Sequence, residues 1–321
     1  MSANDDRRRV AAIDIGSHTL LLLIVEGRKS AEGEPIEARV IHEDCRFGRL
    51  GKGLERTGAL DPGSIADSLE ILGSFRLRID ELDVHAVQVV GTQALREASN
   101  AAEFIDRAGE ILDVPLEIIP GEREARLVHR AVSASFPELA GQPFVVADVG
   151  GGSTEIIVAR PEADIQVCSL PIGSVRLHER HLASDPPTPD QVRALIADID
   201  ATLSQLSGLE VPTGVCLVAT SGTATTIASV QLKLRIYDPE RVHGLSLPRA
   251  VVERQLAQVL PLSINERLRI PGLRPERAVS IDAGIAIFAR LLSRLDASRF
   301  VVSERGVRWG LAHEMLDEPV Q

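Results

Sequence analysis

The sequence predicts an α/β fold made of two domains, and three observations support this prediction. Short apolar runs and stretches of helical periodicity alternate along the chain, which is typical of α/β proteins. The 321 residues are more than one hydrophobic core usually holds. A strand–glycine–strand pattern that contains an aspartate occurs twice, more than a hundred residues apart, which is about the length of a domain.

The elements follow from the spacing of apolar residues. In the first half, two apolar runs around Gly16 predict a buried β-hairpin over 10–15 and 19–25. Further along the first half, helices are predicted over 64–82, 101–112 and 122–135, with strands over 86–90 and 116–119. In the second half, strands are predicted over 144–149, 155–159 and 214–219, with helices over 189–206 and after Gly222.

The composition excludes several classes of protein. A formal net charge of −11 leaves no excess of positive charge for general binding to nucleic acid or to a membrane surface. The cysteines Cys45, Cys168 and Cys216 are far apart, match no metal-binding spacing and fit a reducing compartment. No signal peptide or membrane-spanning run is visible. We expect a cytoplasmic protein without nucleic-acid or membrane partners, and a homodimer is compatible with the sequence.

The second copy of the repeated pattern is typical of a phosphate-binding turn. Glycines 150–152 follow a buried strand, and without Cβ atoms their backbone N–H groups can converge on an anion. Ser153 and Thr154 add hydroxyl donors. Asp148 would repel a phosphate, so we expect it to hold Mg²⁺ through water, and Glu155 could do the same. The alternative is a tight hairpin selected for packing alone.

The first copy is shorter. Asp14 precedes a turn with one glycine, Gly16, followed by Ser17, so fewer backbone N–H groups are available. Alone, this copy would indicate an ordinary hairpin. Together with the second copy it predicts a clamp in which two hairpins hold one phosphate chain.

A pair of glutamates begins the helix between the two halves. Glu122 and Glu124 lie in the segment Gly-Glu-Arg-Glu-Ala-Arg-Leu over 121–127, in or near the first helical turn. The helix dipole favours acidic residues there, which is a sufficient structural reason for both. The functional interpretation is that one carboxylate accepts a proton from an attacking water, as a general base does.

These segments resemble the exopolyphosphatase/guanosine pentaphosphate phosphohydrolase family, within the acetate kinase–sugar kinase–Hsp70–actin fold. The resemblance rests on two phosphate loops, at 14–17 and 148–155, and on a GT-x-x-LR-x-A segment at 91–98. It also rests on the segment of the catalytic glutamate at 119–126, a further loop at 221–223 and a C-terminal signature at 302–311. It covers nearly the whole chain. It implies two actin-like domains over 1–123 and 124–304, with a cleft between them and with 305–321 returning to the first domain.

The resemblance also implies a role for each site residue. The glutamate directly before Ala125, Glu124, corresponds to the catalytic one. The metal, Mg²⁺ or another divalent cation, is expected at Asp14, Asp148 and Glu155. The residues expected to bind the substrate phosphates are Ser17, His18, Arg96, Gly150, Gly151, Gly152, Ser153 and Thr154.

The implied reaction is hydrolysis of a terminal phosphoanhydride bond in inorganic polyphosphate or in guanosine pentaphosphate. Two alternatives come from other classes of function. The chain could sense nucleotide or polyphosphate without turnover, although a sensor has no need of Glu124. It could also be an ATP-dependent kinase of the same fold, although the insertion that such kinases use to bind an acceptor is missing.

Some residues depart from the family pattern or allow two interpretations. His18 stands where the family has Asn, which either makes phosphate affinity sensitive to pH or simply replaces one N–H donor. Trp309 replaces an acidic residue and is expected to pack on a helix. His178 and His181 have metal-compatible spacing but are expected on a solvent-facing helix. The arginines of one helix face could meet a polyanion or be solvated: Arg123, Arg126 and Arg130.

Overall fold

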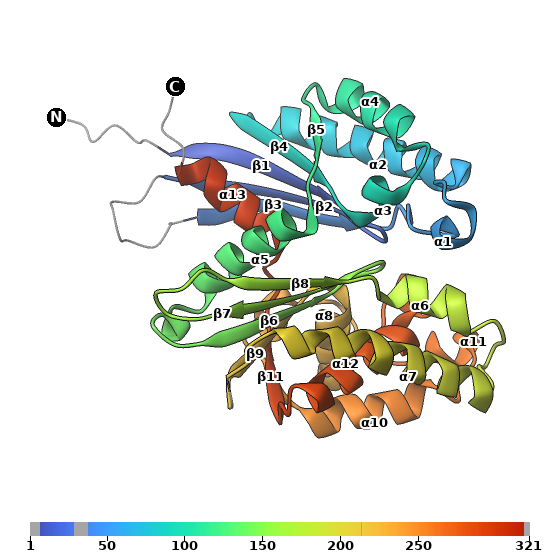
Figure 1. The fold of residues 1–321 in the computed structure, drawn as a ribbon. Helices are drawn as coiled ribbons and strands as arrows, with labels where there is room; N and C mark the ends of the chain where they lie inside the picture. The colour runs from blue at the N-terminus through green and yellow to red at the C-terminus, as the bar shows by residue number, and fades with distance from the viewer. Residues whose placement is uncertain (1–6, 29–37, 213, 318–321) are drawn as a thin grey trace. The chain divides into compact units, whose positions relative to one another are not determined.

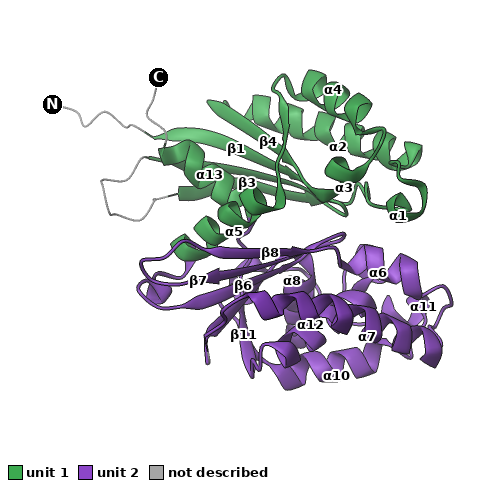
Figure 2. Ribbon diagram, viewed as in Figure 1, with its two compact units in different colours: residues 1–134, 307–321 green, residues 135–306 purple. Residues whose placement is uncertain are grey.

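The computed structural model describes residues 7–28, 38–212 and 214–317, and the chain divides into two compact units. Unit 1 comprises residues 1–134 and 307–321, and unit 2 comprises residues 135–306 (Figure 2). The sequence analysis put the division at 123/124 and 304/305. In the structure, helix α5 (Gly121–Ser135) runs through the first of these positions, so the division falls near the end of that helix.

Unit 1 is built on a five-stranded sheet with the order β3-β2-β1-β4-β5 (Figure 1). Strands β1 (Arg8–Ile15), β2 (Leu20–Gly27) and β3 (Ala38–Arg46) are antiparallel neighbours, whereas β4 (Ala86–Gly91) and β5 (Leu116–Ile118) extend the sheet in parallel. The other helices of this unit are α1 (Leu54–Thr57), α2 (Pro62–Glu81), α3 (Gln93–Glu97), α4 (Ala101–Leu112) and α13 (Val307–Asp317).

Strands β1 and β2 are largely apolar because helices cover the sheet of unit 1. Helix α13 packs against β1 and β2, and α2 packs against β2 and α4. The rings of Phe75 on α2 and Phe104 on α4 are fully buried in this core. Helix α13 also meets α5 closely, since a Cβ at Gly310 would overlap the backbone of Leu127.

Unit 2 is built on a six-stranded sheet with the order β10-β11-β9-β6-β7-β8. Its strands are β6 (Phe144–Val149), β7 (Thr154–Ala159), β8 (Gln166–Leu170), β9 (Cys216–Thr220), β10 (Ser246–Pro248) and β11 (Arg299–Val302). Its α-helices are α6 (Ser174–His181), α7 (Pro189–Leu203), α8 (Ser221–Leu232), α9 (Pro239–Val242), α10 (Arg249–Val259), α11 (Ile264–Arg267) and α12 (Ile281–Arg294), and its 3₁₀ helices are Pro137–Leu139, Ser204–Gly208 and Pro275–Arg277.

The two sheets repeat one topology. In unit 2, β6, β7 and β8 form an antiparallel meander, and β9 and β11 join β6 in parallel on its other side. This is the arrangement of β1, β2, β3, β4 and β5 in unit 1. The internal repeat inferred from the two glycine patterns is therefore a repeat of the sheet, with each glycine turn joining the first two strands of its unit.

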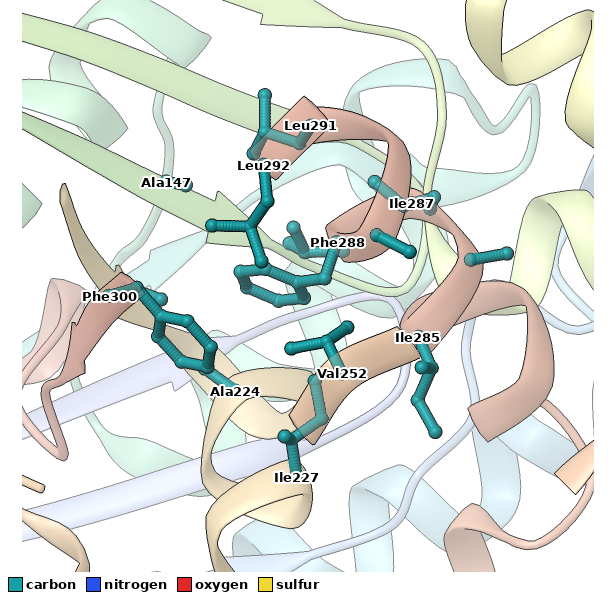
Figure 3. Close-up of a cluster of buried hydrophobic side chains, with 14 of the residues drawn as sticks. Ala147, Ala224, Ile227, Val252, Ile285, Ile287, Phe288, Leu291, Leu292 and Phe300 are labelled. Atoms are coloured by element: carbon teal, nitrogen blue, oxygen red, sulfur yellow. The ribbon is translucent and has the colours of Figure 1, made fainter. Parts of the chain in front are cut away.

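The core of unit 2 surrounds α12. Nearly all residues of this helix are buried, and the ring of Phe288 stacks on Phe300 of β11 with 5.7 Å between ring centroids (Figure 3). Val252 of α10 and Ile227 of α8 close the same cluster. None of the helices in the described ranges is both long enough and apolar enough for a membrane span.

Candidate active site

The turn between β1 and β2 holds the first group of predicted site residues. The Gly16 amide donates to the Thr19 carbonyl at 2.9 Å and closes the turn. The Ser17 hydroxyl donates to Oε1 of Gln93 at 2.7 Å, and both side chains are buried. The Ser17 hydroxyl therefore uses its only proton in the bond to Gln93. To donate a hydrogen bond to a phosphate, it would have to break that bond.

Asp14 and His18 flank this turn. Asp14 lies at the end of β1, paired with Leu21 of β2, and is half-buried. The His18 ring meets Phe47 edge-on, with 5.1 Å between ring centroids. The aromatic contact fixes the ring beside the turn, where the sequence predicted a phosphate contact.

Helix α3 connects the first turn to the predicted catalytic glutamate. The Thr92 amide at its start donates to the Ile15 carbonyl at 3.1 Å, which holds the helix against the turn. Further along, Nη1 of Arg96 donates to the Ile119 carbonyl at 2.7 Å and to Oε2 of Glu124 at 3.0 Å. Arg96, predicted to bind phosphate, is thus also the direct partner of Glu124.

Glu124 is the buried carboxylate of the pair that begins α5. The residue is only 8% exposed. Burial raises the pKa of Glu124 above its ordinary value, and the positive charge and hydrogen bond of Arg96 oppose that rise. Glu122, by contrast, is exposed and pairs with Arg126 at 3.0 Å on the surface of the helix. A buried carboxylate with a raised pKa and a cationic hydrogen-bond donor beside it is suited to accept a proton.

The glycine turn of unit 2 is held by its carbonyl groups. The Gly150 amide donates to the Ser153 carbonyl at 3.0 Å. The carbonyls of Gly150 and Gly151 accept the amides of Ser174 and Val175, each at 2.9 Å, from the first turn of α6. Within the described chain, the amides of residues 151–153 donate no hydrogen bond. Three consecutive N–H groups are therefore left for another acceptor, which is the arrangement that phosphate binding by this turn requires.

Two neighbouring segments fix this turn further. The Val149 carbonyl accepts hydroxyl hydrogen bonds from Ser221 at 2.9 Å and Thr223 at 3.2 Å. Gly173 lies so close to the turn that a Cβ there would stand 2.5 Å from the backbone of Gly151 and the amide nitrogen of Gly152. The turn is thus braced by α8 on one side and by the start of α6 on the other.

The two hydroxyl residues after the glycines differ. Ser153 is buried at the turn. Thr154 is fully buried, and its hydroxyl donates to the Ile172 carbonyl at 2.7 Å. This bond joins β7 to the segment before α6 and uses the proton that the sequence analysis assigned to a phosphate, so the structure gives Thr154 a bracing role.

Asp148 and Glu155 occupy directly opposed positions on β6 and β7. Side chains at such positions lie on the same face of the sheet, and two carboxylates there repel each other. Both are buried, and the Ser169 hydroxyl donates to Oε1 of Glu155 at 2.9 Å. Two carboxylates with retained waters are a donor set that Mg²⁺ favours, so these residues fit the predicted metal. Over the described ranges, no group of three or more His, Cys, Asp or Glu side chains gathers to hold a metal ion.

The two histidines of α6 do not face solvent as the sequence analysis expected. Nδ1 of His178 lies 3.2 Å from Oδ1 of Asp282, and Nε2 of His181 lies 2.7 Å from Oδ2 of Asp198. Their side chains are only 15% and 16% exposed. Each histidine binds α6 to a neighbouring helix, because a polar ring at a helix interface requires a partner.

The arginines of α5 serve mainly within unit 1. Arg123 forms a two-point ion pair with Glu314 of α13, and Arg130 pairs with Asp317 of the same helix. Trp309 is buried on α13 and meets His313 edge-on, as expected for a packing residue. These ion pairs join α5 to α13 and give Arg123 and Arg130 a structural role within unit 1.

Sequence reasoning missed two contributors to the site. Gln93 lies in the GT-x-x-LR-x-A segment, but its bond to Ser17 depends on the pairing of β1 with β4, which the sequence does not display. The segment 170–174 carried a usable signal, because a Pro-Ile-Gly-Ser run between a strand and an amphipathic helix is typical of a tight backbone approach.

Comparison with known proteins gives consistent matches. The model of the Ppx/GppA phosphatase family matches residues 28–319. "Exopolyphosphatase 2" of Mycobacterium tuberculosis is 31% identical over 317 residues, covering 95% of this chain and 97% of that protein. "Guanosine-5'-triphosphate,3'-diphosphate pyrophosphatase" of Vibrio cholerae is 30% identical over 312 residues, covering 96% of this chain but only 59% of that protein.

Solved structures match over almost the whole chain as well. The Aquifex aeolicus member of the Ppx/GppA protein family is 32% identical, with a TM-score of 0.79, and the match covers 98% of this chain and 100% of that one. An exopolyphosphatase from Cytophaga hutchinsonii is 27% identical, with a TM-score of 0.85 and coverage of 97% and 98%.

Proposed function

We propose that the chain, which belongs to the Ppx/GppA phosphatase family, hydrolyses the terminal phosphoanhydride bond of a phosphate chain and releases orthophosphate. Membership of this family agrees with the resemblance inferred from the sequence, and the solved relatives agree with the predicted α/β fold of two actin-like domains. The names of the relatives give two substrates, polyphosphate and guanosine 5′-triphosphate 3′-diphosphate, which is guanosine pentaphosphate. For the second substrate we propose the 5′-terminal phosphate as the one that is released.

The observation that supports hydrolysis best is the state of Glu124. Its burial and the opposing hydrogen bond from Arg96 give a carboxylate whose raised pKa suits proton transfer. In the proposed reaction, water attacks the terminal phosphorus, Glu124 accepts a proton from that water, and the bridging oxygen leaves with the shortened chain. A protein that only sensed phosphate would not need a dehydrated carboxylate in this position.

The amides of the unit 2 glycine turn would bind the terminal phosphate. Residues 151–153 offer three backbone N–H groups, and such donors stabilise the charge that spreads over the phosphoryl oxygens during transfer. The carbonyls of Gly150 and Gly151 are fixed by α6, so the turn needs no rearrangement to present its amides. Arg96 has donors beyond the one it gives to Glu124 and would add positive charge.

A divalent cation, most simply Mg²⁺, would be held by the buried Asp148 and Glu155 of unit 2. Asp14, the third carboxylate that the resemblance assigned to the metal, lies in unit 1 and joins no group of three metal-ligating side chains in the described ranges. Bound by Asp148 and Glu155, the ion would neutralise phosphate charge. The contribution of the chain itself is to orient the carboxylates, as the bond from the Ser169 hydroxyl to Glu155 does. We further propose that the protein acts in the cytoplasm.

We also propose a homodimer as its oligomeric state, which sedimentation analysis would test.

The decisive test is steady-state phosphate release from inorganic polyphosphate and from guanosine pentaphosphate, each with and without Mg²⁺. Mg²⁺-dependent release from at least one of them is expected. No release from either, together with phosphate transfer from ATP to acetate or a sugar, would identify a kinase instead.

A further inference from the structure

A short basic segment, to which the proposed function assigns no role, lies against the turn between β1 and β2. Residues 46–53 read Arg-Phe-Gly-Arg-Leu-Gly-Lys-Gly and connect β3 to α1. The Arg49 amide donates to the His18 carbonyl at 3.1 Å, and the Gly51 amide donates to the Ser17 carbonyl at 2.7 Å. The backbone of this segment is therefore fastened directly to two residues that are predicted to bind phosphate.

The fastening is close and rigid. A Cβ at Gly51 would stand 3.0 Å from the Cβ of Ser17, which leaves room only for glycine or a small shift. Leu50, between the two anchored amides, is fully buried in the core of unit 1. The Lys52 amide donates to the Arg49 carbonyl at 2.9 Å and closes a turn that carries both cations. The backbone of Arg49 and Lys52 is thus held beside Ser17 and His18.

The positive charges of Arg49 and Lys52 are not used in ion pairs within the described part of the chain, so they can attract an anion. In this acidic chain most arginines pair with carboxylates, and within the same segment Arg46 pairs with Asp44 at 2.9 Å. Arg49 and Lys52 are exposed, and neither forms an ion pair with the part of the chain that the structure describes. The pKa of Asp61 is lowered by the hydrogen bond that it accepts from the Ser64 amide at 3.0 Å, which caps α2, and also by the positive charge of Lys52.

The backbone of Arg49 lies in the left-handed region that favours glycine, with a φ of 55°. Other non-glycine residues of the described chain share this region, Lys233 with φ 54° among them, so a control variant can reproduce the same backbone conformation.

We propose that Arg49 and Lys52 form an outer phosphate subsite, which binds phosphoryl groups further along the substrate than the one that is cleaved. This inference rests on the proposed function. Glu124 is buried, so the reacting end of the substrate lies in the buried part of the site and the remaining chain must leave towards solvent. The two exposed cations beside the first turn then meet phosphates that the groups of that turn do not reach, and they favour long polyphosphate over short.

The test compares the double variant Arg49→Gln/Lys52→Gln with Lys233→Gln/Arg235→Gln. The control removes the same two charges beyond the C-terminal end of α8 in unit 2, and it also includes one position with positive φ, Lys233 at 54°. KM is measured for long polyphosphate and for guanosine pentaphosphate, and the inhibition constant is measured for orthophosphate, which occupies only the terminal position.

The proposal predicts that the KM for long polyphosphate rises about tenfold or more in the Arg49/Lys52 variant, the effect of losing one charge-assisted hydrogen bond or more. The inhibition constant of orthophosphate changes far less, and the control variant resembles the unmodified protein. A similar rise for guanosine pentaphosphate would assign the subsite to phosphates of either substrate. Equal changes for orthophosphate and long polyphosphate, or no change in KM, would overturn the proposal.

A binding measurement separates this inference from the proposed function. Calorimetric titration of long polyphosphate into the same variants reports affinity without turnover. If the unmodified protein binds polyphosphate but releases no phosphate, the proposed hydrolysis is wrong, while an affinity loss confined to the Arg49/Lys52 variant still supports the subsite. Equal affinity in all three proteins would overturn the subsite whatever the activity.

Discussion

The Arg96 guanidinium donates to the Glu124 carboxylate at 3.0 Å, and this contact joins the start of α5 to the helix that follows β4. The pKa of Glu124 is therefore subject to two opposing effects, burial and the positive charge of Arg96. Burial alone would favour the protonated acid, which could not act as a base, whereas the cation favours the ionised form. The net result is a pKa of Glu124 above its ordinary value, which suits a group that accepts a proton and later releases it.

Changing Arg96 should move the pH dependence of the reaction. Without the cation, burial acts unopposed and the pKa of Glu124 rises further. Because the base must be ionised, the acidic limb of the kcat/KM profile of Arg96→Gln should then shift to higher pH. Arg96→Lys keeps the charge and should shift less. The control is Arg126→Gln, whose partner Glu122 is exposed; an unshifted limb in Arg96→Gln would remove Glu124 as the titrating group.

The bracing of the unit 2 glycine turn gives a second prediction. A methyl group at Gly173 would stand 2.5 Å from the backbone of residues 151 and 152, so Gly173→Ala must displace the turn. We expect KM to rise while the protein stays folded. Gly208→Ala is the matched control, because nothing lies within 4 Å of its Cβ position. Equal KM values for the two variants would show that the turn does not bind substrate.

The opposed carboxylates of β6 and β7 give a third prediction. Asp148→Asn keeps the size of the side chain but removes one charge from the pair with Glu155. A higher concentration of Mg²⁺ should then be needed for half-maximal activity. Asp164→Asn, an exposed position in the same unit, serves as the control. A Mg²⁺ titration of Asp148→Asn that coincides with that of the control would exclude Asp148 from metal binding.

The buried ion pair of unit 2 gives a prediction about stability. Arg267 and Asp282 lie 2.7 Å apart with side chains 1% and 0% exposed, and Asp282 also meets His178 of α6. Arg267→Met leaves a buried carboxylate without this cation, which should cost about 3–5 kcal/mol of unfolding free energy. Urea denaturation would measure it, with the exposed Arg269→Met as control. Equal midpoints would mean that water compensates the charge.

Much of the fold could be predicted from the sequence, since the strands of both glycine hairpins and helices α2, α4, α5 and α7 have strong periodicity. Strands such as β3 and β8 were not predicted. They are the outer strands of their meanders and are only half-buried, so their residues lack a clear apolar run. The interior of α12 was missed for the opposite reason, because nearly every position is buried and no periodic face appears.

The candidate site could be predicted in outline but not in its contacts. The glycines of the second turn, Glu124 and Arg96 are visible as motifs. That Arg96 and Glu124 form a pair, or that Thr154 binds the Ile172 carbonyl, depends on which strands lie side by side. The same holds for Arg49 and Lys52, whose place beside Ser17 results from hydrogen bonds between backbone groups, which carry no sequence signal.

The most direct test of the account is phosphate release by Glu124→Gln measured beside the unmodified protein and Glu122→Gln, with polyphosphate and guanosine pentaphosphate as substrates. Glutamine keeps the shape of the side chain and can still meet Arg96, but it cannot accept the proton. We predict that kcat of Glu124→Gln falls by about 10²–10⁴, the usual contribution of a general base, while substrate affinity and thermal stability stay close to those of Glu122→Gln. Near-normal turnover by a folded Glu124→Gln protein would contradict the account.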